Sequence, residues 1–275
     1  MEGHVNFDST PGCQKRAHGF IMDPNAGMLD RLQQNLVATL LRRLDRLPRH
    51  VGIIMDGNRR FAHHHGADRK AGHASGFDAM SRVLAMAYSA GISEVSVYAF
   101  SIENFNRSPE EVDDLMEIAR TRLTELISHA GLAQEYNVRI RVVGDLALLP
   151  ADIRALADQI TRQTKQNNNA TLNLCMPYTS REDMRHALAL AALDAKNHVD
   201  TDPLSVAGIS ARLRTAGGRP LDLLIRTSNT QRLSDFLLWE ITDHTYIDFV
   251  PALWPEYTRW QFLQSVLRWW QRSPR

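Results

Sequence analysis

The chain has 275 residues, of which 44% are hydrophobic, and its 32 basic and 31 acidic residues leave a formal net charge of +1. This balance argues against a nucleic-acid-binding protein, which normally carries a basic excess. The length and the hydrophobic content are sufficient for a single large α/β domain. Cys13 and Cys175 are far apart and have no metal-ligand spacing, and no disulfide is expected between them, so a reducing compartment is favoured.

The N-terminal part divides into two segments. Residues 1–27 are polar and irregular, so we expect a disordered tail before one domain over residues 28–275. Within residues 28–47, leucines recur at helical spacing between arginines, which predicts an amphipathic helix. This helix either packs on its own domain or lies on an anionic membrane surface. No apolar run reaches the roughly 18 residues that span a bilayer, and no signal peptide is recognised.

Strands and helices alternate along the rest of the chain. Short apolar runs predict strands at 51–55, 94–100, 138–143, 171–175 and 221–225. Helical patterns lie between them at 71–89, 109–130, 150–166 and 181–195, and a last one follows at 260–270. Such alternation predicts a single α/β domain with a central, mostly parallel sheet that is flanked by helices on both faces.

The first predicted strand ends at a group of polar residues. Its apolar run stops at Asp56, and Gly57, Asn58, Arg59 and Arg60 follow directly. Glycine lets backbone N–H groups approach a ligand, and the amide and the arginines can donate to phosphate oxygens. An acid beside such donors usually implies a divalent cation, because a bare carboxylate would repel the anion.

Polar residues also follow the other strands. Ligands bind outside the carboxyl ends of the strands in such sheets, so these residues are expected to converge. They are Arg69 and His73 beyond the first strand, Ser101, Asn104 and Arg107 after the second, and Arg226, Arg232 and Ser234 after the last. This set is suited to two phosphate-bearing ligands, whereas no GxxxxGKS or GxGxxG pattern supports P-loop or dinucleotide chemistry.

Several ordered blocks resemble the signature motifs of the cis-prenyltransferases. They are HVGIIMDGNRRF, the Gly72-His73 pair, YAFSIENFNRSPEEV and DLLIRTSNTQRLSDFLLW, and the resemblance runs from about His50 to about Tyr257. The LSDFLLW and LWPEY stretches are more similar to eukaryotic dehydrodolichyl diphosphate synthases than to bacterial enzymes. The resemblance implies a Mg²⁺-dependent condensation of isopentenyl diphosphate with an allylic prenyl diphosphate, which gives a Z-polyprenyl diphosphate.

The resemblance also implies roles for the polar residues. The allylic diphosphate would be bridged by Mg²⁺ to Asp56 and would lie on Gly57, Asn58, Arg60 and Arg69. Isopentenyl diphosphate would be held by Arg226, Arg232 and Ser234. The family's polar residues around the proton loss correspond to Asn104, His73 and Ser101, although the released diphosphate could equally take the proton.

Four further residues are expected at the same site. Arg59 would donate to phosphate oxygens. Phe61 and Phe105 either wall the site or pack beneath it. Arg107 either contacts a substrate or forms an ion pair with Glu103. The growing chain would enter an apolar tunnel between the helices.

The chain departs from the family pattern after its last predicted strand. Asn229 and Thr230 replace a usual Gly-Glu pair, and asparagine is the residue that best tolerates a backbone conformation reserved for glycine. Glu240 replaces a usual glutamine, and Asp243 or His244 lies near the position of a metal-binding glutamate of bacterial relatives.

These departures leave alternatives open. One is a divergent enzyme of the same fold that ionises an allylic diphosphate and cyclises or hydrolyses it. Another is a non-catalytic partner subunit of a heteromeric cis-prenyltransferase, although such subunits typically lose the first block. The resemblance implies a homodimer or a heteromer with a same-fold subunit. It also implies a cytoplasmic protein, with peripheral contact at the cytosolic face of the endoplasmic reticulum as a further expectation.

Overall fold

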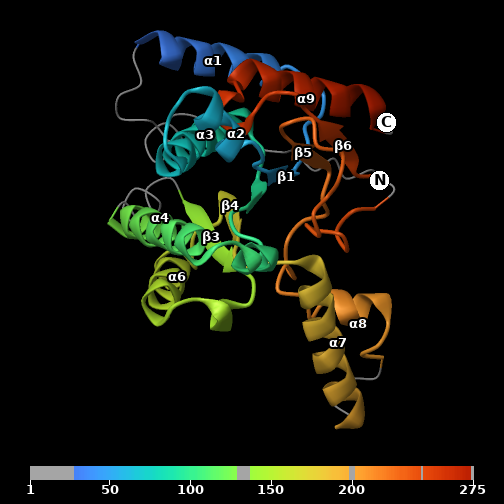
Figure 1. Ribbon diagram of the computed structural model, residues 1–275. Helices are drawn as coiled ribbons and strands as arrows, with labels where there is room; N and C mark the ends of the chain where they lie inside the picture. The colour runs from blue at the N-terminus through green and yellow to red at the C-terminus, as the bar shows by residue number, and fades with distance from the viewer. Residues whose placement is uncertain (1–27, 129–136, 198–201, 243, 274–275) are drawn as a thin grey trace, which may run out of the picture.

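Six parallel strands form one sheet at the centre of the molecule (Figure 1). The computed structural model describes residues 28–128, 137–197, 202–242 and 244–273, so the predicted disordered tail lies outside the described residues. The strands are β1 (His50–Ile54), β2 (Glu94–Tyr98), β3 (Val138–Val143), β4 (Ala170–Cys175), β5 (Leu223–Arg226) and β6 (Tyr246–Phe249). Their order across the sheet is β3-β4-β2-β1-β5-β6.

The five predicted strands are confirmed, with small differences at their ends. The sequence does not predict β6, which has only four residues and is mostly half-buried. This edge strand pairs with β5. Arg268 also donates hydrogen bonds to Asp248 at 3.0 and 2.7 Å. These contacts join residues that are about 20 positions apart in the sequence, so no local pattern predicts the strand.

Helices connect the strands. They are α1 (Met28–Arg42), α2 (Asn58–His64), α3 (Arg69–Ala90), α4 (Pro109–Ser128), α6 (Ala151–Gln163), α7 (Ser180–Lys196), α8 (Val206–Ser210) and α9 (Arg259–Arg272), with short 3₁₀ turns η1 (Ile102–Asn106), η2 (Leu146–Leu148) and η3 (Trp254–Glu256). The sequence pattern does not predict α2. It begins directly after Gly57, whose φ of 115° is a conformation that only glycine adopts without strain.

The two faces of the sheet are covered differently. One large core packs side chains such as Ile53, Val97 and Ile140 against α1, α3, α4, α6 and α9. On the opposite face, a smaller cluster joins Ile54 and Leu224 to the irregular segments at 221 and 233–241. Helix α7 projects away from the sheet with α8 beside it (Figure 1). The sequence predicts helices on both faces of the sheet. In the structure, helices cover one face and largely irregular segments cover the other.

Helix α1 confirms the predicted amphipathic helix, but only part of its leucine stripe is buried. Val37 and Leu41 are fully buried against α3 and α9, whereas Leu32 and Leu36 are 57% and 51% exposed. None of the helices in the described ranges combines the length and the apolar character that crossing a membrane would require.

Candidate active site

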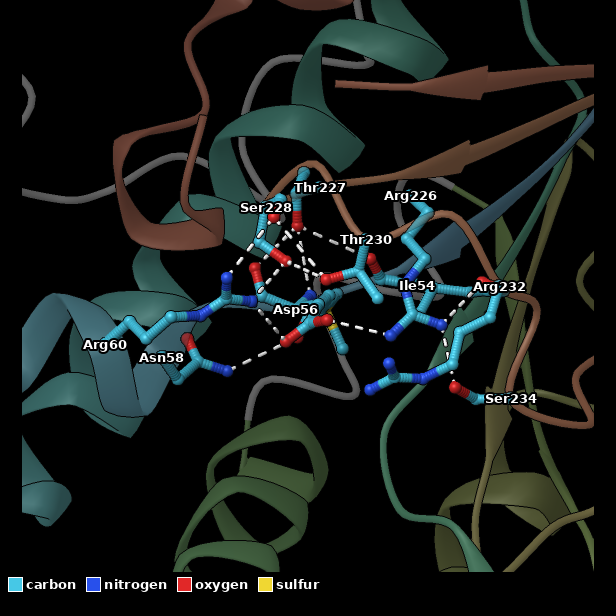
Figure 2. A network of polar contacts seen from close by, with 11 residues as sticks. Ile54, Asp56, Asn58, Arg60, Arg226, Thr227, Ser228, Thr230, Arg232 and Ser234 are labelled. Carbon is cyan, nitrogen blue, oxygen red and sulfur yellow. Dashed lines mark hydrogen bonds and ion pairs between the residues drawn. The ribbon is translucent and has the colours of Figure 1, made fainter. Parts of the chain in front are cut away.

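The site is centred on Asp56, which follows β1 at the carboxyl edge of the sheet. Strand β5 lies next to β1 with Ile54 opposite Arg226, so the end of β5 places Arg226 beside Asp56. The Arg226 guanidinium donates to Asp56 Oδ2 at 2.8 Å, and Arg60 of α2 donates to Oδ1 at 3.3 Å (Figure 2). The two arginines reach the carboxylate from opposite sides, so the start of α2 and the end of the distant strand β5 meet at one acid.

Arg226 is the most enclosed of these charges, since its side chain is only 3% exposed. Besides Asp56, it donates to the backbone oxygen of Arg232 and to Ser234 Oγ, both at 2.7 Å. These bonds fix its orientation and bring Arg232 and Ser234 to the site. The Arg232 side chain is exposed, and its guanidinium lies next to that of Arg226 (Figure 2).

The loop after β5 supports Asp56 and Arg60. The amide of Asp56 donates to Thr227 Oγ1 at 3.0 Å, and the Thr227 hydroxyl donates to the Asp56 backbone oxygen at 2.7 Å. Arg60 donates to Ser228 Oγ at 2.5 Å and to the Ser228 backbone oxygen at 3.3 Å. Ser228 and Asn229 have φ values of 74° and 54°, so the asparagine adopts the left-handed conformation expected where a glycine is usual.

The arginines decide the charge state of Asp56. Partial burial by itself would raise the pKa of this carboxyl, but the hydrogen bond and the charge of Arg226, followed by Ser228 and Arg60, lower the pKa below its ordinary value. Asp56 is therefore ionised at neutral pH, and its side chain is still 27% exposed.

An apolar cavity adjoins this charged cluster. Met55 and Asn58, on either side of Asp56 and Gly57, line it, together with residues of α3, α4 and β4 and Trp254. Trp254 donates through Nε1 to the backbone oxygen of Gly76 at 2.7 Å, which fixes η3 against α3. The structure thus contains the predicted apolar space between helices, next to the cluster of Asp56 and its arginines.

His73 lies in this cavity rather than in the arginine cluster. Burial lowers the pKa of its imidazole, and the positive charge of Arg107 lowers it further. The ring is therefore neutral at physiological pH and can accept a proton or a hydrogen bond.

Ser101 and Asn104 form a capping box at η1. Ser101 Oγ accepts from the amide of Glu103 at 3.2 Å, and Asn104 Oδ1 accepts from the amide of Ser101 at 2.8 Å. Phe105 packs edge-to-face on Phe100, which lines the cavity, at a centroid distance of 4.9 Å. These residues shape the loop after β2 beside the cavity.

The ion pair predicted between Arg107 and Glu103 is not the one that forms. Arg107 donates to Glu111 Oε1 at 2.7 Å, one turn further along the chain, and Arg59 approaches the same oxygen at 3.5 Å. Glu103 instead faces Arg181 at 3.7 Å. The reason is that α4 begins at Pro109, so positions 107 and 111 lie on one side of the helix start.

The remaining predicted residues lie around α2. Gly57 is packed so closely that a Cβ would meet the Leu253 backbone at 3.0 Å. Phe61 is half-buried and stacks on His65 at 4.2 Å, away from the cavity-lining residues. Arg69 begins α3, and its side chain lies outside the described residues.

Sequence reasoning assigned no role to Thr227, Ser228 or Trp254. The two hydroxyls directly follow Arg226, so their position after a buried strand was a usable signal. Trp254 comes from η3, about 200 residues beyond Asn58, and only the folded chain brings it to the cavity.

Asp56 fits a magnesium ion that is bound mainly through a substrate. Its ionised carboxylate is a hard oxygen donor, and Mg²⁺ is typically held by one or two carboxylates together with substrate phosphates. No cluster of three or more acidic, histidine or cysteine side chains that could hold a metal occurs among the described residues. A protein-only metal cage is thus not formed by that part of the chain, whereas one carboxylate combined with a diphosphate is compatible with Mg²⁺.

Comparisons with known proteins agree with this geometry. The profile of a family described as putative undecaprenyl diphosphate synthase matches residues 54–275. A dehydrodolichyl diphosphate synthase complex subunit of Schizosaccharomyces pombe is 39% identical over 241 residues, which cover 87% of this chain and 90% of that protein. The corresponding human subunit is 43% identical over 223 residues, covering 81% of this chain and 67% of that protein.

Solved structures give the same result. A lavandulyl diphosphate synthase from Lavandula x intermedia, in complex with dimethylallyl diphosphate, superposes with a TM-score of 0.78 at 28% identity, covering 83% of this chain and 98% of that one. A probable undecaprenyl diphosphate synthase from Campylobacter jejuni has a TM-score of 0.66 at 26% identity, covering 84% and 98%.

Proposed function

The chain belongs to the undecaprenyl diphosphate synthase-like family of cis-prenyltransferases, and we propose that it condenses isopentenyl diphosphate with an allylic prenyl diphosphate to give a Z-polyprenyl diphosphate. The observation that carries this proposal is the position of Asp56, between Arg60 and Arg226 and next to Met55 and Asn58, which line an apolar cavity. Charged groups for diphosphates and an apolar space for a prenyl chain lie side by side, as this reaction requires.

The allylic diphosphate occupies the side of Asp56 that faces α2. Asn58 and Arg60 supply donors there, and Gly57 allows the backbone to come close. Arg69 and Arg59 are proposed to add positive charge at the same end. Mg²⁺, held by Asp56 and the diphosphate oxygens, would offset the charge that develops on the leaving group.

Isopentenyl diphosphate occupies the side of Asp56 that faces β5. The exposed guanidinium of Arg232 lies beside Arg226, and Ser234 Oγ is within hydrogen-bond distance of Arg226. Arg226 already bonds Asp56 and the 232–234 loop, so it orients the site as well as contributing charge. We propose that Arg232, whose side chain is exposed, can adjust to a phosphate more easily than Arg226.

The proton that leaves after carbon–carbon bond formation needs an acceptor near the cavity. His73 is neutral and lines the cavity, so it can accept the proton, and the released diphosphate is the competing acceptor. Asn104 uses Oδ1 for the capping box, which leaves its amide nitrogen as the group to orient a diphosphate oxygen. Ser101 holds this asparagine in place, whereas Phe105 and Arg107 support the cavity wall and the start of α4.

The test is an incubation of the purified chain with farnesyl diphosphate, labelled isopentenyl diphosphate and Mg²⁺. Label in longer prenyl chains supports the proposal. Unlabelled hydrocarbon or alcohol supports a cyclising or hydrolysing enzyme. Activity that appears only when a same-fold subunit is added, and that persists in Asp56→Asn, identifies this chain as a non-catalytic subunit.

We also propose a same-fold partner, either a second copy or another subunit. The relatives in Schizosaccharomyces pombe and human are named as subunits of a complex. Large apolar side chains are exposed on α7 and around α8, including Leu188, Leu193, Leu204 and Val206. Light scattering of wild type and Leu193→Glu tests this surface, and an unchanged mass for an oligomeric protein would exclude it.

A peripheral membrane contact is proposed for α1, which would place the protein at the cytosolic face of the endoplasmic reticulum. Leu32, Leu36 and Leu40 are exposed one turn apart, with Arg31 exposed on the same helix and Arg43 exposed directly after it. Flotation with phosphatidylserine vesicles tests this contact. Equal flotation of wild type and Leu36→Glu would contradict it.

A further inference from the structure

The apolar cavity contains one charged side chain that the reaction itself does not need. Arg122 of α4 lines the cavity, and its guanidinium lies over the Phe77 ring of α3 at 4.2 Å from the centroid. A second contact holds it, since Nη1 donates to Glu125 Oε2 at 2.8 Å. Arginine remains protonated under all ordinary conditions, so a permanent charge faces an otherwise apolar space.

The position of this pair along the cavity follows from the course of α4. The helix starts beside the diphosphate end, because Glu111 in its first turns faces Arg59 of α2. At a rise of 1.5 Å per residue, Arg122 lies roughly 16 Å further along the helix than Glu111. Phe77 lies one turn beyond His73 on α3. The Arg122–Phe77 pair therefore bridges the two helical walls about three turns of α4 beyond Glu111.

A lengthening prenyl chain would meet this bridge with its apolar end. The end gains nothing from contact with a guanidinium, and passing it requires the separation of Arg122 from both Phe77 and Glu125. The Arg122 side chain is 24% exposed, so it also lies where the cavity approaches solvent between α3 and α4. Each condensation beyond this point is less favourable than the one before it.

We propose that Arg122, held over Phe77, is a specificity-determining residue that sets the length of the polyprenyl product. This inference rests on the proposed function, because it concerns the number of isopentenyl units that the same site adds. Arg122 does not contact the reacting atoms, so it is expected to leave the first condensation unchanged.

The experiment compares Arg122→Leu with Arg120→Leu. Arg120 is on the same helix but pairs with Asp152 at 2.5 Å, outside the cavity lining, so it controls for loss of an arginine from α4. Products are resolved by chain length at one fixed ratio of farnesyl to isopentenyl diphosphate. We expect Arg122→Leu to lengthen the main product by at least one five-carbon unit, with the initial rate of incorporation within about twofold of wild type, and Arg120→Leu to match the wild-type distribution.

An unchanged or shortened product from Arg122→Leu overturns the inference, as does an equal lengthening by Arg120→Leu. If Arg122→Leu does not fold, Phe77→Leu provides the same test, because it removes the ring that holds the guanidinium, and it too is expected to lengthen the product. Failure of the proposed function is seen separately, as an absence of labelled elongation by the wild-type chain.

Discussion

Glu240 offers a quantitative test of the structure, because it is a partly buried acid at a position where glutamine is usual in the family. Its Oε1 accepts a hydrogen bond from Thr215 Oγ1 at 2.5 Å, but its Oε2 is buried without a hydrogen-bond partner. Burial raises the pKa of this carboxyl, the Thr215 hydroxyl opposes the shift, and the charge of Asp183 raises the pKa further. The folded chain thus holds Glu240 more easily as the neutral acid.

The substitution Glu240→Gln keeps the shape and removes the charge. A buried acceptor without a partner costs about 1–3 kcal/mol, and more when it is charged. Glutamine removes the charge but still places a polar group at the buried position, so only part of this cost is recovered. We therefore expect the free energy of unfolding at pH 7.5 to increase by about 1–2 kcal/mol. With about 2.1 cal/mol/K of unfolding entropy per residue, 275 residues give about 0.6 kcal/mol/K, so Tm should rise by about 2–3 °C.

The pH dependence has a definite sign. A raised pKa in the folded state means that the native protein binds the Glu240 proton more tightly, so stability falls as pH rises through that pKa. The difference between Glu240→Gln and wild type should be close to zero below pH 4.5, the ordinary value, and should grow as pH rises. Asp183, whose pKa burial also raises, is present in both proteins and contributes to both curves.

Urea denaturation at several pH values measures this difference. Glu256→Gln is the matched control, because Glu256 is exposed and the same chemical change there is expected to alter stability by no more than about 0.5 kcal/mol. If Glu240→Gln increased stability equally at all pH values, or decreased it at pH 7.5, the charge of Glu240 would not be the source of the destabilisation.

Three further outcomes are expected. Asp56→Asn should lower kcat by about 10²–10³-fold while the circular dichroism spectrum stays native. Because Arg226 lowers the pKa of Asp56, the acid limb of the wild-type pH–rate profile should lie below the ordinary carboxyl range. Near-wild-type turnover of the variant, or an acid limb above that range, would refute this role. Asn229→Ala should lower the free energy of unfolding by about 1 kcal/mol and Asn229→Gly should not, since the φ of 54° is strained for alanine; equal effects would contradict the backbone argument. Trp254→Phe should cost about 1–3 kcal/mol by leaving the Gly76 oxygen without its donor, and a neutral result in denaturation would mean that water replaces the indole.

The centre of the site was predictable because parallel strands direct their carboxyl ends to one edge. Asp56 and Arg226 are 170 residues apart, yet each follows an apolar run, and adjacent strands bring them to 2.8 Å. The left-handed backbone conformation of Asn229 agrees with the sequence, because asparagine, which tolerates this conformation best, replaces a usual glycine there.

Other features depend on contacts that no local pattern encodes. Strand β6 is stabilised by β5 and by Arg268. The leucines of α1 are divided, because α3 and α9 pack on Val37 and Leu41 whereas Leu32 and Leu36 are exposed. In the sequence, Arg122 is not distinguished from Arg120, the other arginine of α4, and only the fold places Phe77 beneath it.

The two arginine hydrogen bonds to Asp56 have a consequence for the two diphosphates of the proposed reaction. One oxygen is bonded to a guanidinium from α2 and the other to a guanidinium from the end of β5, so each neighbouring position shares the same anion. A diphosphate that draws one arginine toward itself leaves the carboxylate dependent on the other. Occupancy of the first position then changes the affinity of the second, and thermodynamic reciprocity requires an equal effect in the opposite direction. If the proposed function holds, this shared side chain would couple the two positions.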